Sequence, residues 1–146
     1  MTMRNLTQVE GMSLEVLKSE IDCAFETFAG YLPMLRSTGC VVNTATYIGQ
    51  SAVRSWVMGA DASKREAPQI EIEQMQTTVR DAMAAGVLCF FSSTSPAHND
   101  EGGLPMPSSL SSDVEMMALI KAMAEGGKRG KGVYTVTKGG RMPVFL

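Results

Sequence analysis

Apolar residues along this chain alternate between helical spacing and short continuous runs, which predicts helices interleaved with buried strands. The clearest helical stripe predicts a long helix from about Pro68 to Ala85, with Gly86 just past its end and Pro68 in its first turn. The apolar face of this helix consists of Ile72, Met75, Val79, Ala82 and Met83. We therefore expect this helix to bury one side against a core.

Four weaker patterns predict further helices. They run from Leu14 to about Ile21, from Glu26 to Arg36, from Ala52 to Met58 and from Ser112 to Ala124. We expect Ser51 to cap the third of these helices, and Gly126 and Gly127 to end the fourth. Ser112 and Glu115 form a capping-box pattern, in which the hydroxyl and the carboxylate each satisfy a free backbone amide of the other residue.

Three β-branched and aromatic runs predict strands at Cys40 to Gly49, Val87 to Phe91 and Gly132 to Thr137. The run Val87 to Phe91 is continuously apolar, which is typical of a strand buried on both faces in a parallel sheet. Because helices separate the strands, the order predicts consecutive βα units with right-handed crossovers. The expected class is α/β with about three parallel strands and flanking helices. Since a βα barrel takes eight strands, these units are predicted to be part of something larger.

A long polar loop follows the second predicted strand and carries the only histidine, His98. Ligands of α/β proteins bind at the carboxyl ends of parallel strands, so we expect a working surface here. His98 is a candidate to line that surface, the alternative being an exposed loop histidine. Ser92 and Ser93 are candidates to hydrogen-bond a substrate, although serines after a strand are also common turn formers.

The composition fits one soluble globular domain, with 146 residues, 45% apolar residues and 19% charged residues. A net charge of −2 disfavours a nucleic-acid partner. No apolar segment is long enough to cross a bilayer or has the form of a signal peptide, so we expect no membrane association and a cytoplasmic location. The three cysteines, Cys23, Cys40 and Cys89, are far apart and are expected to be reduced thiols, with Cys89 buried and inert.

Motifs that carry catalytic chemistry are weak in this sequence. The stretch from Gly126 to Gly132 has the glycines of a phosphate loop, but its spacing is one residue short and it lacks the serine or threonine for magnesium. A zinc hydrolase site needs several imidazole or thiolate ligands, whereas the chain has one histidine and three scattered cysteines. We therefore expect no metal to be bound by this chain alone and assign it no catalytic residue.

Several stretches, in the same order and spacing, resemble the D-aminoacylase-like branch of the amidohydrolase superfamily. NTATYIGQSAVRSWVMG at Asn43 to Gly59 resembles that branch's NVAxxxGHSxxRxxVMG segment. AAGVLCFFSSTSPAHNDEGGLPMPSSL at Ala84 to Leu110 is similar to AGAxGFxTSxxxxHxxxxGxPxPSRL. LTQVEGM at Leu6, FETFAGYLPML at Phe25 and GKGVYTVTKGG at Gly130 also match segments of the branch.

The resemblance implies part of a TIM-type (β/α) barrel from a metal-dependent hydrolase. Enzymes of this branch use zinc to activate water and cut a C–N bond, such as the amide of an N-acyl-D-amino acid. The family takes its metal ligands from a HisxHis pair and from later His and Asp strands, and none of these segments occurs here. Residues 1–146 are therefore expected to be a single internal fragment of such a barrel, inactive alone, whose substrate class is a small N-acyl amino acid or related amide.

Two residues of the first matching segment need separate comment. Gln50 stands where the family has histidine, so the position retains hydrogen bonding but cannot transfer a proton. Arg54 matches the family arginine and is either a substrate anchor or a structural ion-pair partner. The candidate substrate-binding set is His98, Ser92, Ser93, Gln50 and Arg54. The alternative function is a non-catalytic α/β protein that binds a partner or itself, or a complementing chain, through an open sheet edge.

Overall fold

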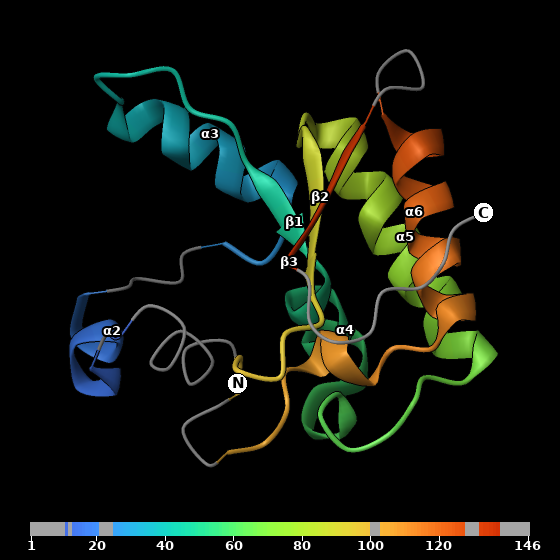
Figure 1. The fold of residues 1–146 in the computed structure, drawn as a ribbon. Coiled ribbons are helices and arrows are strands. Elements are labelled where there is room, and N and C mark those ends of the chain that lie inside the picture. The colour runs from blue at the N-terminus through green and yellow to red at the C-terminus, as the bar shows by residue number, and fades with distance from the viewer. Residues whose placement is uncertain (1–10, 12, 21–24, 100–102, 128–131, 138–146) are drawn as a thin grey trace.

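The computed structural model describes residues 11, 13–20, 25–99, 103–127 and 132–137, and it contains a three-stranded parallel sheet (Figure 1). The strands are β1, Tyr47–Gly49, β2, Cys89–Ser93, and β3, Val133–Thr137, in the order β1-β2-β3. Ile48, Phe90 and Tyr134 lie side by side in one row across the sheet. The predicted α/β class with parallel strands and flanking helices is confirmed.

Helices connect the strands and pack mainly on one side of the sheet (Figure 1). The α-helices are α2, Leu14–Glu20, α3, Phe28–Thr38, α4, Gln50–Met58, α5, Gln69–Ala85, and α6, Asp113–Gly126, with short 3₁₀ turns η1, Gly59–Asp61, and η2, Pro107–Leu110. Each predicted helix occurs within a few residues of its expected bounds, and Gly86 ends α5 in the left-handed conformation at φ 116°. In the described part of the chain, no helix combines the length and apolar character needed to cross a membrane.

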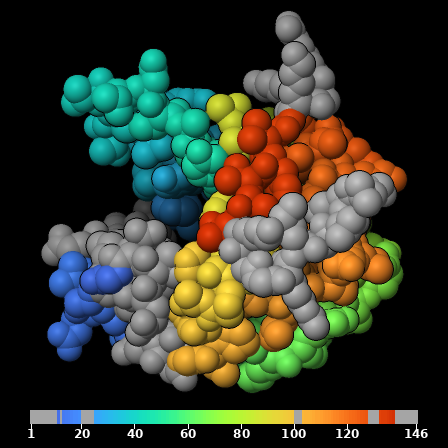
Figure 2. Space-filling view, in the orientation of Figure 1, coloured from blue at the N-terminus to red at the C-terminus, as the bar shows by residue number. Residues whose placement is uncertain are grey.

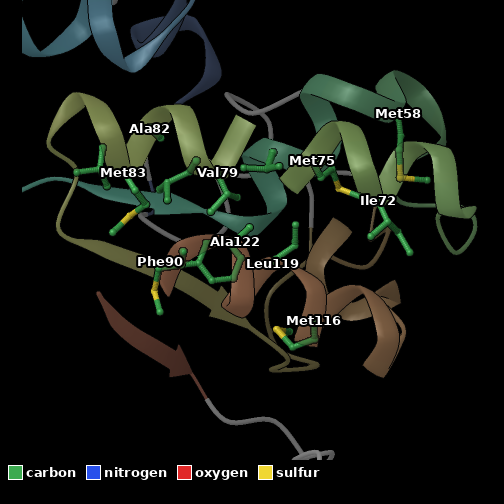
Figure 3. Close-up of a cluster of buried hydrophobic side chains, with 14 of the residues drawn as sticks. Met58, Ile72, Met75, Val79, Ala82, Met83, Phe90, Met116, Leu119 and Ala122 are labelled. Carbon is green, nitrogen blue, oxygen red and sulfur yellow. The ribbon is translucent and has the colours of Figure 1, made fainter. Parts of the chain in front are cut away.

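The hydrophobic core lies between the sheet and the helix pair α5 and α6 (Figure 3). All five residues of the predicted α5 stripe are buried there. The strands contribute Ile48 and the fully buried Phe90, whose ring stacks on Tyr134 with centroids 5.9 Å apart. Because burying each large apolar side chain stabilises a fold by roughly 1.5–3 kcal/mol, this layer holds the structure together.

The two core helices approach closely at Gly126, the last residue of α6. A Cβ atom at this position would lie 2.8 Å from the Cα atom and 2.9 Å from the carbonyl oxygen of Arg80 on α5. Both of these atoms belong to the backbone, so a larger residue would push the helices apart. Gly126 therefore allows the contact between the helices, and Gly127 follows it as the C-cap.

The bounds predicted for the first two strands are wrong. Residues 40–46 lie outside β1, and Val41 and Val42 are exposed. A β-branched run becomes a strand only where a neighbour pairs with it, and pairing starts at Tyr47 opposite Cys89. β2 starts two residues later than predicted because the backbone N–H of Val87 still donates to Ala82 at the end of α5.

The two faces of the sheet differ sharply in cover. Side chains alternate between faces along a strand, and the register keeps aligned residues on the same face. The covered face, which packs on the helices, carries Ile48, Phe90, Ser92, Tyr134 and Val136. The bare face carries Tyr47, Cys89, Phe91, Val133 and Thr135. Tyr47 and Val133 are 59% and 56% exposed. The prediction that the run Val87 to Phe91 is buried on both faces is wrong, because Leu88 is 57% exposed and Cys89 and Phe91 are half-buried.

Candidate functional site

The sequence-predicted site residues gather at the carboxyl edge of the sheet, because parallel strands end on the same side. Gln50 directly follows β1, and Ser92 and Ser93 end β2. The structure divides the candidate set between the two faces. Gln50, Arg54 and Ser92 lie on the side of the sheet that packs on the helices. Ser93 alternates with Ser92 along β2, so it belongs to the bare face by register, and it contacts His98.

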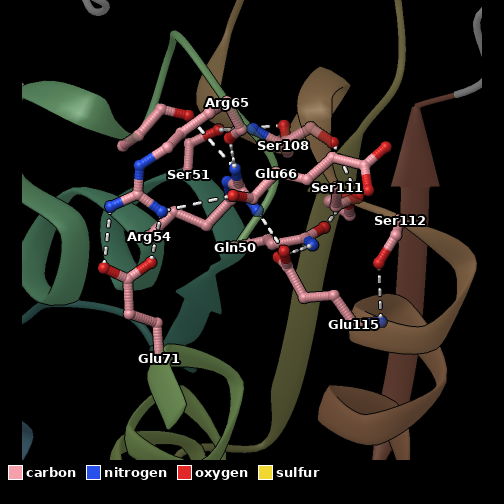
Figure 4. A network of polar contacts seen from close by, with 12 residues as sticks. Gln50, Ser51, Arg54, Arg65, Glu66, Glu71, Ser108, Ser111, Ser112 and Glu115 are labelled. Atoms are coloured by element: carbon pink, nitrogen blue, oxygen red, sulfur yellow. Dashed lines mark hydrogen bonds and ion pairs between the residues drawn. The ribbon is translucent and has the colours of Figure 1, made fainter. Parts of the chain in front are cut away.

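A buried polar network joins the first group to α6 (Figure 4). Ser92 Oγ donates to Gln50 Oε1 at 2.6 Å, and Gln50 Nε2 donates to Glu115 Oε1 at 3.0 Å. Arg54 Nη1 donates to the other oxygen of Glu115. All four side chains are almost completely buried. The Gln50 amide thus uses its acceptor end for Ser92 and its donor end for Glu115.

Arg54 also holds the connection between η1 and α5. Its Nη2 donates to the carbonyl oxygens of Ala62 at 3.3 Å and of Arg65 at 2.9 Å. Burial lowers the pKa of Arg54 and raises the pKa of Glu115, while the attraction between the two side chains opposes both changes. Arg54 is therefore an ion-pair partner inside the protein, as one of the two sequence interpretations proposed. Contact of Arg54, Gln50 or Ser92 with a substrate stays a prediction.

Glu115 is the network residue that the sequence analysis assigned differently. Ser112 Oγ accepts a hydrogen bond from Glu115 N at 3.2 Å, which confirms one half of the capping box. The other half is wrong, because the Glu115 carboxylate turns inward to Gln50 and Arg54. Glu115 is four residues before Leu119 and therefore lies on the buried stripe of α6, and this spacing was the available signal.

On the bare-face register, Ser93 and His98 form a close pair. Ser93 Oγ lies 2.7 Å from His98 Nδ1, and Ser95 N donates to the same hydroxyl at 3.3 Å. His98 is half-buried, and its carbonyl oxygen accepts from Met106 N at 3.3 Å. The loop after β2 therefore folds back over the strand end, and it holds a hydroxyl and an imidazole in hydrogen-bond contact at the edge where α/β proteins bind ligands.

Two further serines fix this loop to the neighbouring strand unit. Ser108 Oγ donates to the carbonyl oxygen of Ser93 at 2.7 Å, and Ser51 Oγ donates to Ser108 Oγ at 2.9 Å. The prediction that Ser51 caps its helix is wrong, because α4 begins at Gln50 after Gly49 and the Ser51 hydroxyl bonds to Ser108 instead. No pattern in the sequence pairs residues 57 positions apart.

The residues present do not fit the metal centre that the family resemblance implies. In the parts of the chain that the structure describes, no three histidine, cysteine, aspartate or glutamate side chains gather in a way that could hold a metal ion. Cys40 is exposed and Cys89 is half-buried on the bare face, where an inert buried thiol was expected, and both are unpaired. Cys23 lies outside the described residues.

A groove of ≈ 390 Å³ lies at the opposite, amino edge of the sheet. It runs between α3 and the segment before β1, and its walls include Leu32, Arg36, Val42 and Leu88. None of the sequence-predicted site residues lines it. Polar candidates and groove therefore occupy different ends of the sheet, and the amino end of βα units is typically a stability face.

Comparisons with known proteins confirm the resemblance found in the sequence. No family model matches the chain. A D-aminoacylase from Alcaligenes xylosoxydans xylosoxydans is 37% identical over 75 residues, which is 51% of this chain and 15% of that protein. Two crystal structures, of D-aminoacylase as a novel subset of amidohydrolases and of a D-aminoacylase mutant in complex with CuCl2, each match at TM-score 0.59 and 30% identity.

The structural matches cover 75% of this chain and 20% of each D-aminoacylase chain. The chain therefore spans about a fifth or less of the length of the proteins it resembles. Its sheet and flanking helices correspond to part of a (β/α) barrel.

Proposed function

We propose that this chain is the substrate-side portion of a metal-dependent amidohydrolase that hydrolyses a non-peptide C–N bond, such as the amide of an N-acyl-D-amino acid. The observation that carries the proposal is the Ser93–His98 pair, which the loop after β2 holds at the carboxyl edge of the sheet. The similarity of the chain to D-aminoacylase supports the reaction class. A cytoplasmic location fits the unpaired Cys40 and Cys89.

In this proposal Ser93 and His98 contact the substrate and position it. A hydroxyl both donates and accepts hydrogen bonds, and a neutral imidazole does the same through its two nitrogens. Together they suit the carboxylate or amide of a small N-acyl amino acid. Gln50, Arg54 and Ser92 act indirectly in this proposal, without touching the substrate. Their network holds the end of β2, to which Ser93 belongs.

Zinc is the metal that the family resemblance implies, and it would supply an activated water. The described residues offer no ligand set for it, so the activity requires ligands from beyond this portion. Alone, the purified chain should bind no stoichiometric zinc and release no acetate from N-acetyl-D-amino acids. Metal analysis together with an acetate assay tests this, and robust hydrolysis by the isolated chain would contradict it.

The role of His98 is tested in a chimera in which this chain's matching stretch replaces the corresponding fifth of D-aminoacylase. Loss of one hydrogen bond to substrate lowers the rate by roughly 3- to 10-fold, so His98→Ala should reduce kcat/KM by about that factor. Val114→Ala, at an exposed position of α6, is the matched control. An active chimera whose kcat/KM is the same with and without the His98 imidazole would dispose of the substrate-contact role.

A second candidate function is partner binding without catalysis. The specific observation that favours it is the bare face, with Tyr47 and Val133 more than half exposed. If the chain only binds a partner, His98→Ala should leave the kcat/KM of the chimera unchanged, whereas partner binding should still depend on the bare face. A substrate-contact role therefore predicts a lower kcat/KM in His98→Ala, and partner binding alone predicts no change.

A further inference from the structure

The imidazole of His98 is held through one of its two ring nitrogens. Its Nδ1 atom lies 2.7 Å from Ser93 Oγ, whereas none of the other described residues makes a hydrogen bond to Nε2. The backbone around the ring is also fixed, since His98 N donates to the carbonyl oxygen of Ser95 at 3.1 Å and the His98 carbonyl oxygen accepts from Met106 N at 3.3 Å. Figure 2 shows the loop that carries this residue, in yellow to orange, at the surface of the molecule.

The contacts of Ser93 give the hydrogen bond to His98 a direction. A backbone N–H can only donate, so Ser93 Oγ accepts from Ser95 N at 3.3 Å. Ser93 is 4% exposed, and its single hydroxyl hydrogen therefore needs an acceptor inside the protein. Among the described residues, His98 Nδ1 is that acceptor. If Nδ1 carried the hydrogen and donated it to Ser93, the hydroxyl hydrogen would be buried without a partner, which is unfavourable.

This direction determines the tautomer of the neutral imidazole. A neutral ring carries one N–H, so a ring whose Nδ1 accepts a hydrogen bond has its proton on Nε2. The hydroxyl of Ser93 has already used its hydrogen on the ring. The pair of Ser93 and His98 therefore offers a ligand one donor, the Nε2–H group, on the side of the ring away from Ser93.

We propose that Ser93 is a positioning residue that holds His98 in the Nε2–H tautomer, and that His98 uses this N–H to select an oxygen acceptor of the ligand, either a carboxylate or a carbonyl oxygen. An N–H group of a ligand would meet a second donor at this point, which disfavours it. The tautomer follows from contacts within the chain. The ligand as an N-acyl amino acid rests on the proposed function.

The tautomer can be measured directly because His98 is the only histidine in the sequence. In the full purified chain, labelled with nitrogen-15, its two ring nitrogens give one pair of imidazole signals in NMR spectra. At alkaline pH, where histidine side chains are neutral, we expect the chemical shifts of a protonated Nε2 and an unprotonated Nδ1. A neutral ring with its proton on Nδ1 would overturn the proposal without any variant.

Serine variants test whether Ser93 sets the tautomer. Ser93→Ala removes the hydroxyl and should lower the ratio of the Nε2–H to the Nδ1–H tautomer by roughly 3- to 10-fold, the effect of one hydrogen bond. Ser93→Thr keeps a hydroxyl and should restore the ratio. Ser95→Ala is the matched control, because it removes a hydroxyl from the same loop but keeps the Ser95 N–H, and it should leave the ratio unchanged.

Circular dichroism establishes that these variants fold. An unchanged tautomer ratio in Ser93→Ala, or an equal change in Ser95→Ala, would contradict the positioning role of Ser93.

The donor role of His98 is tested in the chimera described above, with an N-acetyl-D-amino acid and with its C-terminal amide, which lacks the carboxylate. If Nε2–H binds the carboxylate, His98→Ala should raise KM for the acid by roughly 3- to 10-fold and leave kcat/KM for the amide unchanged. If it binds the acyl carbonyl oxygen, where charge develops during the reaction, kcat should fall for both substrates. Unchanged kinetics with both substrates would contradict the donor role.

The two parts of the test keep this inference separate from the proposed function. An Nε2–H tautomer in the purified chain, together with a folded chimera that hydrolyses neither substrate, contradicts the proposed function alone. An Nδ1–H tautomer in the purified chain, together with an active chimera, contradicts this inference alone.

Discussion

The two faces of the sheet differ in how completely their side chains are buried. On the covered face, apolar side chains pack on α5 and α6, and the buried charges of Arg54 and Glu115 neutralise each other. On the bare face, apolar side chains such as Val133 remain in contact with water. Packing on the covered face therefore stabilises the fold. Because exposed apolar patches mark interaction sites, the bare face is where binding should be sought.

This comparison also assigns the candidate site residues to different tasks. Gln50, Arg54 and Ser92 belong to the covered face, where each makes hydrogen bonds within the protein. Ser93 and His98 form a separate pair at the end of the bare-face register, where Ser93 is buried and His98 is half-buried. Neighbouring residues in a strand, Ser92 and Ser93, thus serve opposite faces, because side chains alternate along the strand.

The largest effect is expected from breaking the buried ion pair. Glu115→Leu leaves the Arg54 guanidinium buried without its counter-charge, which typically costs about 3–5 kcal/mol. Urea unfolding of the variant measures this loss. The double variant Arg54→Met with Glu115→Leu should recover much of the stability, since no unpaired charge remains. A single variant as stable as the parent would show that the network contributes nothing to folding.

A matched pair of phenylalanines compares the two faces directly. Phe90 is fully buried on the covered face and Phe91, the next residue, is half-buried on the bare face. Phe90→Ala should cost about 3–5 kcal/mol, as for other core phenylalanines. Phe91→Ala should cost about 2 kcal/mol less, because its ring is already partly in water. Equal losses from the two thermal unfolding curves would mean that both faces are packed alike.

Gln50 tests whether its network is structural. A neutral histidine also offers one donor and one acceptor nitrogen, so Gln50→His should cost less than about 1 kcal/mol. Gln50→Leu leaves the Ser92 hydroxyl and one Glu115 oxygen without partners and should cost about 1–3 kcal/mol. Chemical denaturation of both variants gives the comparison. Equal losses would contradict the bridging role.

Local patterns were sufficient to predict the helices and the order of the strands. The stripe from Ile72 to Met83 fixes α5, and Gly86 ends it as expected. The family resemblance brought Gln50 and Arg54 forward as a pair. Their shared partner Glu115 stayed hidden, because 61 residues separate it from Arg54 and its capping pattern offered a sufficient local explanation.

Strand bounds and face assignments depend on pairing, which a single sequence does not contain. The run from Cys40 to Gly49 has strand character throughout, yet only Tyr47–Gly49 meets a partner. The apolar run in β2 suggested two buried faces because its composition is the same on both sides. Only the positions of α5 and α6 decide which of Phe90 and Phe91 is covered.

The smallest effect is expected at the exposed ion pair beside the buried one. Arg65 donates to both oxygens of Glu71, at 2.8 and 2.9 Å, and this contact lowers the pKa of the Glu71 carboxyl. A lowered pKa stabilises the fold above the pKa of unfolded glutamate, and the gain disappears as pH falls through the lower folded value. Glu71→Gln should therefore cost less than Gln50→Leu at neutral pH and nothing in strong acid.

Salt separates the two ion pairs further. Arg65 is 42% exposed, so added salt should screen its attraction to Glu71, whereas the pair of Arg54 and Glu115 is buried and should be insensitive. Urea unfolding at two salt concentrations and at pH 7 and 3 measures both effects. If Glu71→Gln lost as much stability as Glu115→Leu, or lost it only in acid, the distinction between the buried ion pair and the exposed ion pair would fail.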